Sequence, residues 1–154
     1  MIHRQTFKLG LDGVDAFGII YFGQYQHWFQ QAQEGLLEDA GHALREILDG
    51  GLGFPIVHFE MDFFRPLRLS DTVEAECRLL EAGKRSLRFC VRFFDPTGHL
   101  AAEARSVQVA TGADFSPRPV PDWLRAAVEV RPPEPVPVGA VPTPMPDGSR
   151  GGVG

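Results

Sequence analysis

The sequence predicts an α+β domain in which a curved antiparallel sheet wraps around one long central helix. A stretch that begins near Phe22 repeats apolar residues at helical spacing, whereas at least four later stretches alternate apolar and polar residues. Short turn sequences join those later stretches, which favours antiparallel neighbours. A sheet with one apolar face needs a cover, and only one long helix is available to provide it.

The periodic pattern ends near residue 130, and we expect one folded domain over residues 1–130. Of the 154 residues, 44% are hydrophobic and 23% are charged, which is ordinary for a globular chain. Residues 131–154 are dominated by Pro and Gly, contain few bulky apolar residues and show no periodicity. Such a segment buries too little surface to offset its chain entropy, so we predict a disordered tail.

The central helix is predicted to begin near Phe22. Its apolar residues form one broad stripe, and glutamines occupy much of the opposite face. The stripe consists of Phe22, Tyr25, Trp28, Phe29, Ala32, Leu36 and Leu37. A break near Gly41 then leads into a short second helix, which the glycine pair at 50–51 should end.

After residue 53 the period of the pattern changes to two, which is typical of strands. In the segment 54–66, one face is expected to carry Val57, Phe59, Met61 and Phe63, and the other His58, Glu60 and Asp62. Further strands are expected over 72–80, 85–95 and 99–111, with a turn at "DPTG" (95–98). The opening segment "HRQTFKLGL" is a weaker strand candidate.

Charge and cysteine content exclude several classes of partner. The formal net charge is −5, whereas binding to nucleic acid needs clustered Lys and Arg, so no nucleic-acid partner is expected. No apolar run reaches the roughly 18–20 residues that span a bilayer, and the N-terminus lacks the apolar core of a signal peptide, so we expect a cytoplasmic protein that does not enter membranes. Cys77 and Cys90 are too few for a disulfide scaffold or a zinc site, and we expect buried, reduced thiols and no metal.

Asp15 stands seven residues before Phe22, too early to cap the central helix. Lone aspartates favour turns, in which they hydrogen-bond to their own backbone. Alternatively, the carboxylate serves chemistry at the helix start, where the N–H groups of Phe22 and Gly23 lack helical partners and the dipole is positive. Gly18 would let the intervening backbone turn tightly or approach a ligand closely. The residues alone leave both interpretations open.

Two further places have a structural and a functional interpretation. In "GKRS" (83–86), Lys84 and Arg85 could pair with phosphates while Ser86 donates a hydrogen bond, or the segment could be a solvated turn. His58 shares a predicted strand face with Glu60, where it would be a structural or interface histidine, or else a substrate contact.

Three segments of the chain, in order, resemble the hotdog-fold thioesterases of the 4-hydroxybenzoyl-CoA thioesterase type. They are "DAFGIIYFGQYQHW" (15–28), "FPIVHFEMDFFRPLRLSDTV" (54–73) and "GKRSL" (83–87). The resemblance covers about residues 5–112. It implies the hotdog fold, hydrolysis of an acyl-CoA substrate without metal or cofactor, and a homodimer or homotetramer with active sites at the subunit interface.

By this resemblance, Asp15 corresponds to the catalytic carboxylate, which acts as a general base or as a nucleophile. Phe22 and Gly23 correspond to the helix start, whose backbone N–H groups polarise the thioester carbonyl. The implied substrate contacts are Gly18, Tyr21, Tyr25, His58, Lys84, Arg85 and Ser86. The chain departs from many relatives at Gly13, where they carry a second aspartate; Asp12 is one residue out of register and is not taken as its replacement.

The aromatic-rich entry to the helix most resembles enzymes that act on aromatic acyl groups, namely 4-hydroxybenzoyl-CoA and 1,4-dihydroxy-2-naphthoyl-CoA thioesterases. The alternatives are a medium- or long-chain acyl-CoA thioesterase and a non-catalytic acyl-CoA-binding module. A hotdog dehydratase or hydratase is disfavoured, because such enzymes use a His with an acidic residue around the long helix and no His precedes this helix in the right motif. The presence of Asp15 favours an enzyme over a binding module.

Overall fold

The computed structural model describes residues 1–136, so most of the predicted tail lies outside the described part of the chain. The elements in order are β1 (Ile2–Lys8), the 3-10 helix η1 (Leu11–Gly13), α1 (Phe22–Asp39), α2 (Leu44–Asp49), β2 (Leu52–Gly53), β3 (Ile56–Phe63), β4 (Thr72–Ala82), β5 (Ser86–Phe94), β6 (Leu100–Val109), β7 (Thr111–Gly112) and α3 (Asp122–Ala126). The predicted central helix, second helix and strands are therefore confirmed, whereas α3 and the β2–β7 pair were not predicted.

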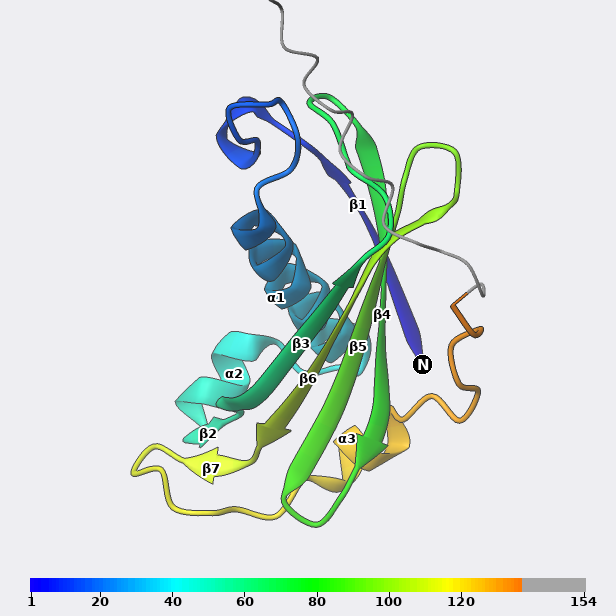
Figure 1. The fold of residues 1–154 in the computed structure, drawn as a ribbon. Helices are drawn as coiled ribbons and strands as arrows, with labels where there is room; N and C mark the ends of the chain where they lie inside the picture. The colour runs from blue at the N-terminus through cyan, green and yellow to red at the C-terminus, as the bar shows by residue number, and fades with distance from the viewer. Residues whose placement is uncertain (137–154) are drawn as a thin grey trace, which may run out of the picture.

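Five strands form one antiparallel sheet in the order β1-β4-β5-β6-β3. The sheet curves around α1, which lies against one of its faces (Figure 1). Helix α1 packs mainly against β1 and β4 and less against β5, so it is displaced toward the β1 side of the sheet. This displacement leaves the inner face of β6 and β3 for other groups to cover.

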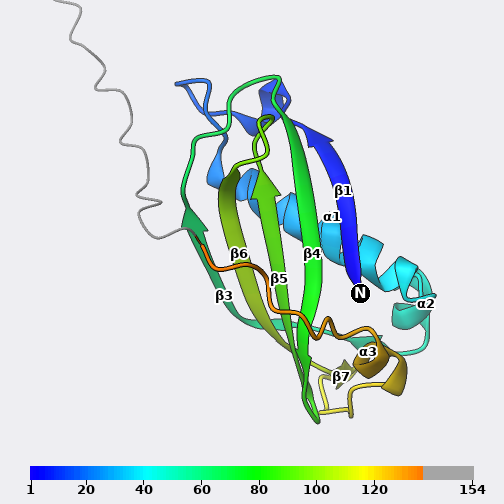
Figure 2. The same cartoon turned by 90° about the vertical axis from the view of Figure 1, so that its right-hand side faces the viewer.

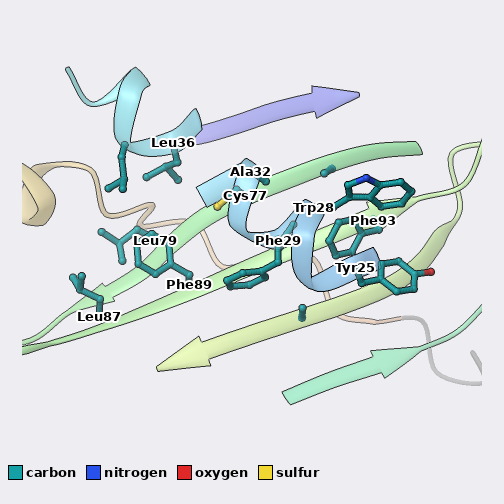
Figure 3. Close-up of a cluster of buried hydrophobic side chains, with 14 of the residues drawn as sticks. Tyr25, Trp28, Phe29, Ala32, Leu36, Cys77, Leu79, Leu87, Phe89 and Phe93 are labelled. Carbon is teal, nitrogen blue, oxygen red and sulfur yellow. The ribbon is translucent and has the colours of Figure 1, made fainter. Parts of the chain in front are cut away.

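The core lies between the apolar stripe of α1 and the inner face of the sheet. Tyr25 packs against Phe93 with ring centroids 5.0 Å apart, and Trp28 stacks on Phe7 at the same separation. Further along the helix, Phe29 meets Phe59 edge to face. Figure 3 shows these helix side chains pointing toward the strands. The 3.6-residue period of α1 and the two-residue period of the strands thus meet in one hydrophobic layer.

The N-terminal half of β3 departs from the predicted alternation. The register of β3 on β6 shifts between Ile56 and His58, so one extra residue enters the strand there. Ile56 pairs with the inner-facing Gln108 and lines the α1 side of the sheet, although 52% of it is exposed, and Val57 is 60% exposed. The prediction that Val57 shares the core face with Phe59 is therefore wrong, because a bulge resets the alternation between them.

The outer face of the sheet is polar but is not fully solvated. The chain after α3 crosses this face (Figure 2), and the carbonyls of Arg131 and Glu134 accept hydrogen bonds from Arg78 and Arg92. This cover explains why Cys90, which alternation places on the polar face, is 1% exposed. Cys77 on the inner face is also buried, and both thiols are free, as predicted.

His3 joins β1 to the C-terminal half of α1. Its Nδ1 lies 2.7 Å from Asp39 Oδ2, and its ring rests directly on Gly35. A Cβ at Gly35 would lie 2.1 Å from His3 Nε2, a separation that no real contact allows. The absent side chain at Gly35 is therefore what lets the strand and the helix approach each other here.

Candidate active site

Asp15 lies in a tight hairpin that leads directly into α1. The N–H of Asp15 donates to Ile19 O at 2.8 Å, and Gly18 N–H donates to Asp15 O at 3.0 Å. Gly18 has φ +72°, the left-handed conformation that glycine adopts without strain and that this kind of three-residue loop requires. Asp15 Oδ1 accepts from the N–H groups of Phe17 at 2.8 Å and Ile19 at 3.3 Å. The local sequence thus determines the hairpin through an aspartate and a glycine three residues apart.

The same hairpin geometry recurs at the β5–β6 turn. Asp95 Oδ1 accepts from the N–H groups of Thr97 and His99, both at 2.9 Å, and Gly98 N–H donates to Asp95 O at 2.9 Å. Hydrogen bonding within the turn is therefore not what distinguishes Asp15. Asp15 differs from Asp95 in its position, because the Asp15 side chain is exposed and its hairpin ends at the start of α1.

The start of α1 offers open hydrogen-bond donors. The N-cap residue Tyr21 makes no side-chain cap bond, and the first turn contains no acidic residue. Within residues 1–136, the N–H groups of Phe22 and Gly23 have no hydrogen-bond acceptor. These donors, together with the positive end of the helix dipole, form a place where negative charge on an oxygen is stabilised.

The hairpin sets the separation between the carboxylate and these donors. Tyr21 N–H donates to Gly13 O at 2.8 Å, so Gly13 lies beside the N-cap residue of α1. Asp15 is two residues further along the extended strand, about 7 Å away at the usual rise per residue.

A cleft beside the helix start is lined by the carboxylate of Asp12 and not by that of Asp15. Asp12, in η1, lines this cleft together with Tyr21, Gly23 and Gln26. Asp12 was not predicted as a site residue, because it is one position out of register with the family motif. Its place in the cleft follows from the 3-10 helix η1, which the sequence pattern did not predict. A Cβ at Gly13 would lie 2.8 Å from Leu9 Cδ1, so no side chain fits there without displacing its neighbours.

A second cavity runs along the flank of α1 that faces β3. Its volume is about 540 Å³. It is lined by Gln26, Phe29, Gln30, Gln33, Glu34, Leu37, Leu44, Leu48, Leu52, Gly53, Phe54, Ile56, Phe59 and Gln108. Gln26 also lines the cleft at the helix start, so the flank cavity and this cleft adjoin at Gln26.

The predicted phosphate-binding segment lies at the other end of the molecule. Lys84 and Arg85 are exposed, and neither side chain forms an ion pair within the described residues. Ser86 begins β5. The 11 residues of β4 separate this loop from the Asp15 hairpin, a distance of about 35 Å at the usual strand rise. One protomer therefore does not bring Asp15 and Lys84 together.

Two other predicted contacts also lie away from the helix start. His58 Nε2 is 3.5 Å from Glu60 Oε2 on the outer face of β3, opposite the face that α1 covers. Tyr25 is 1% exposed in the core, where burial raises the pKa of its hydroxyl. Tyr21, by contrast, is 51% exposed beside Gly23 and lines the cleft. A substrate-binding role for His58 and Tyr25 stays a prediction.

Metal binding and membrane spanning each need features that can be checked in residues 1–136, the part of the chain that the structure describes. Within that part, no cluster of three or more His, Cys, Asp or Glu side chains is arranged to hold a metal ion. No helix there is both long and apolar enough to cross a bilayer.

The fold and the sequence together define a class of protein. The model of the thioesterase-like superfamily matches residues 9–128, and the chain belongs to this family. The predicted hotdog fold and the predicted resemblance to thioester-hydrolysing enzymes are thereby confirmed.

Three relatives show where the chain lies within the family. It is 32% identical over 108 residues to a 1,4-dihydroxy-2-naphthoyl-CoA hydrolase of Rippkaea orientalis, covering 68% of this chain and 78% of that one. The structure of a 1,4-dihydroxy-2-naphthoyl-CoA thioesterase from Synechocystis has the same fold, with a TM-score of 0.76 and 21% identity over 83% of this chain and 96% of that one. A gentisyl-coenzyme A thioesterase matches with a TM-score of 0.74 and 25% identity, over 79% and 98%.

Proposed function

We propose that this protein hydrolyses CoA thioesters of aromatic acyl groups, with Asp15 as the catalytic carboxylate. The observation that carries the proposal is the hairpin that holds an exposed carboxylate and leads directly into the start of α1, where the N–H groups of Phe22 and Gly23 are open. Relatives named for hydrolysis of 1,4-dihydroxy-2-naphthoyl-CoA and gentisyl-CoA support an aromatic acyl group.

The chemistry follows from the two parts of this site. The helix N–H groups polarise the thioester carbonyl and stabilise the oxyanion, an effect worth a few kcal/mol per donor. Asp15 either takes a proton from the attacking water or adds to the carbonyl carbon itself, forming an anhydride that water then opens. In both routes the C–S bond breaks, a carboxylic acid forms, and CoA leaves as the free thiol.

The substrate site is proposed to be completed by a second copy of the chain. An acyl-CoA held by Asp15 and by Lys84 of one protomer would have to follow the whole length of β4. Strand β3 is an edge strand, and it carries Ile56, Val57 and Phe63 as exposed apolar residues. Pairing of β3 with its symmetry mate would cover this edge and bring the partner's opposite end toward each Asp15 hairpin.

Thiol release from a panel of CoA thioesters tests the proposal. The panel contains 4-hydroxybenzoyl, 1,4-dihydroxy-2-naphthoyl, benzoyl, hexanoyl and palmitoyl thioesters. We expect the highest kcat/KM with an aromatic acyl group. A preference for hexanoyl or palmitoyl would instead identify an alkyl-chain thioesterase, and binding without thiol release from any substrate would identify a non-catalytic module.

A further inference from the structure

Two arginines on the outer face of the sheet bind the crossing segment, which comprises residues 129–136. Arg78 on β4 donates from Nη1 to Arg131 O at 3.2 Å, and Arg92 on β5 donates from Nη2 to Glu134 O. Figure 2 shows this segment, in orange, passing over β4 and β5 toward β6. The sheet thus supplies side-chain donors, and the segment supplies backbone acceptors.

A carboxylate holds each of these arginines in place. Arg78 Nε donates to Glu76 Oε1 at 2.8 Å, and Arg92 Nε donates to Glu103 Oε2 at 2.7 Å. The Arg92 and Glu103 side chains are only 9% and 4% exposed. Each guanidinium is therefore already ordered by its carboxylate, and it still has N–H groups left for the segment.

The backbone of the crossing segment offers mainly acceptors. Pro132, Pro133 and Pro135 have no backbone N–H, and the N–H of Arg131 donates to Glu129 Oε1 at 3.1 Å. A segment that runs across strands has no ladder in which to pair its N–H groups, so proline suits this path. Proline also fixes its own φ and favours an extended conformation in the residue before it, so the segment is stiff before it binds.

The spacing of the two arginines matches an extended segment. Arg78 pairs with Cys90, and Arg92 lies two residues further along β5, so the two arginines are about 8 Å apart at the usual strand spacing and rise. The carbonyls that they bind belong to residues three apart in the chain. Three residues span about 9 Å in a polyproline II conformation but about 4.5 Å in a helix. The site therefore fits an extended segment and not a helical one.

The crossing segment is fixed at its root and shallowly held beyond it. At the root, Glu129 N–H donates to Leu79 O at 2.9 Å, and the Glu129 carboxylate pairs with the N-terminal ammonium group at 3.0 Å. Beyond the root, four of the six residues 131–136 are exposed. The match to the family model ends at residue 128, so the segment lies outside the part of the chain that the family shares.

We propose that the outer face of the sheet is a binding site for an extended, proline-rich segment, and that its partner is the crossing segment of a second copy of this chain. Each copy carries one site and one segment, so a segment that leaves its own sheet fits the sheet of a neighbour equally well. A tethered segment competes at an effective concentration on the order of mM, so exchange requires the tethered segment to be loosened. The site lies on the face opposite α1, and the inference does not depend on the proposed hydrolysis.

The test uses a full-length variant in which Pro132, Pro133 and Pro135 are replaced by Gly, together with a fluorescent peptide of residues 129–136 (EVRPPEPV). Glycine loosens the tethered segment because it adds conformations that must be given up on binding. By fluorescence anisotropy, we expect the peptide to bind this loosened variant about tenfold or more tightly than it binds wild type. A peptide with Gly in place of the three prolines should bind the variant about tenfold or more weakly than the proline peptide does.

The reactivity of Cys90 shows whether the peptide binds at the proposed site. The crossing segment covers Cys90, whereas Cys77 is buried on the inner face. Iodoacetamide should label Cys90 faster in the loosened variant than in wild type, and saturating peptide should restore the wild-type rate. Cys77 should stay unlabelled, which shows that the fold is intact. If Cys77 is labelled, Pro133→Gly alone provides the same comparison with a smaller change.

Arg78→Met, made in the loosened variant, removes one of the two donors. Glu76 keeps Arg4 as a partner at 2.8 Å, so no carboxylate is left unpaired. The peptide should then bind about tenfold or more weakly, the usual effect of losing a hydrogen bond from a charged donor. Arg88→Met is the matched control, because Arg88 is also on β5 but pairs with Glu81 at 3.1 Å. The inference is overturned if the peptide fails to bind the loosened variant or to protect Cys90, if the Gly peptide binds as well, or if Arg78→Met binds as tightly as Arg88→Met.

Discussion

Substitution of Gly35 by Ala tests how β1 is joined to the central helix. In an unobstructed helix interior, Gly to Ala stabilises a protein by about 0.5–1 kcal/mol. Here the new Cβ would lie 2.1 Å from His3 Nε2 and 2.4 Å from His3 Cε1, so the imidazole must move away. Its movement breaks the 2.7 Å hydrogen bond to Asp39.

The free-energy terms predict a net loss of stability. Loss of the His3–Asp39 bond costs about 1–3 kcal/mol, depending on the charge of the imidazole, and exposure of the ring adds to this. These costs exceed the gain in helix propensity, so Gly35→Ala should destabilise the fold by about 1–2 kcal/mol. In a His3→Ala background the obstruction is gone, and the same substitution should stabilise by about 0.5–1 kcal/mol.

Urea unfolding of the four proteins in this cycle gives the coupling free energy between the two positions. All four are measured at one protein concentration, because any association would shift the apparent stability. The expected change of sign between backgrounds is the decisive feature. If Gly35→Ala destabilises the His3→Ala protein as much as wild type, the imidazole contact is not what requires glycine at position 35.

The other predictions concern the thiols, the C-terminal crossing and pH. Burial raises the pKa of both thiols, that of Cys90 to about 12, so iodoacetamide at pH 8 should label neither Cys77 nor Cys90 in the native protein and both in urea. In a chain that ends at Ala127, mass spectrometry should find Cys90 labelled and Cys77 unlabelled; equal protection of both would show that the crossing segment does not cover the outer face. For Asp95, burial alone would raise the carboxyl pKa, but the bonds from the Thr97 hydroxyl and nearby backbone N–H groups outweigh it and lower the pKa. Because the pKa is lower in the folded state, this stabilisation is present above the unfolded pKa of about 3.9 and is lost as pH falls through the folded value. Asp95→Asn should therefore lose less stability than wild type over that range, as measured by the urea midpoint, and parallel curves would contradict the assignment.

Local patterns in the sequence were sufficient to predict the two helices α1 and α2 and the five strands of the main sheet. Helix α1 begins at Phe22 as its apolar stripe predicts, and the glycines at 41 and 51 have the positive φ values expected where helices end. The alternation of β4 and β5 correctly gives their inner faces. Each of these features depends on residues within a few positions of one another, and a periodic pattern in the sequence reflects only such short separations.

Features that depend on distant segments could not be predicted in this way. The burial of Cys90 arises from a segment some 40 residues later in the chain, and nothing in the local alternation indicates it. The bulge that exposes Val57 depends on the register against β6.

The candidate site likewise has some features that the local sequence predicts and others that depend on distant segments. The hairpin at Asp15 can be predicted from an aspartate and a glycine three residues apart, but the same pattern at Asp95 forms an equivalent turn between β5 and β6 that does not lead into α1. Gln33 and Gln108, which line the flank cavity, hydrogen-bond to each other across 75 positions of the chain, and only the folded chain shows this pair.

Asp95→Asn provides the control for the most direct test of Asp15. Asparagine keeps the Oδ1 acceptor that both hairpins use, so Asp15→Asn and Asp95→Asn should fold alike while each removes one carboxylate. The measurement is kcat/KM for the aromatic CoA thioester that wild type hydrolyses best, with Asp12→Asn included because Asp12 lines the cleft beside the helix start. We predict a loss of about 100-fold or more for Asp15→Asn, within the usual contribution of an acid–base group, and near wild-type activity for Asp95→Asn. Retained activity in Asp15→Asn, or a comparable loss in Asp12→Asn alone, would contradict the assignment of Asp15 as the catalytic carboxylate.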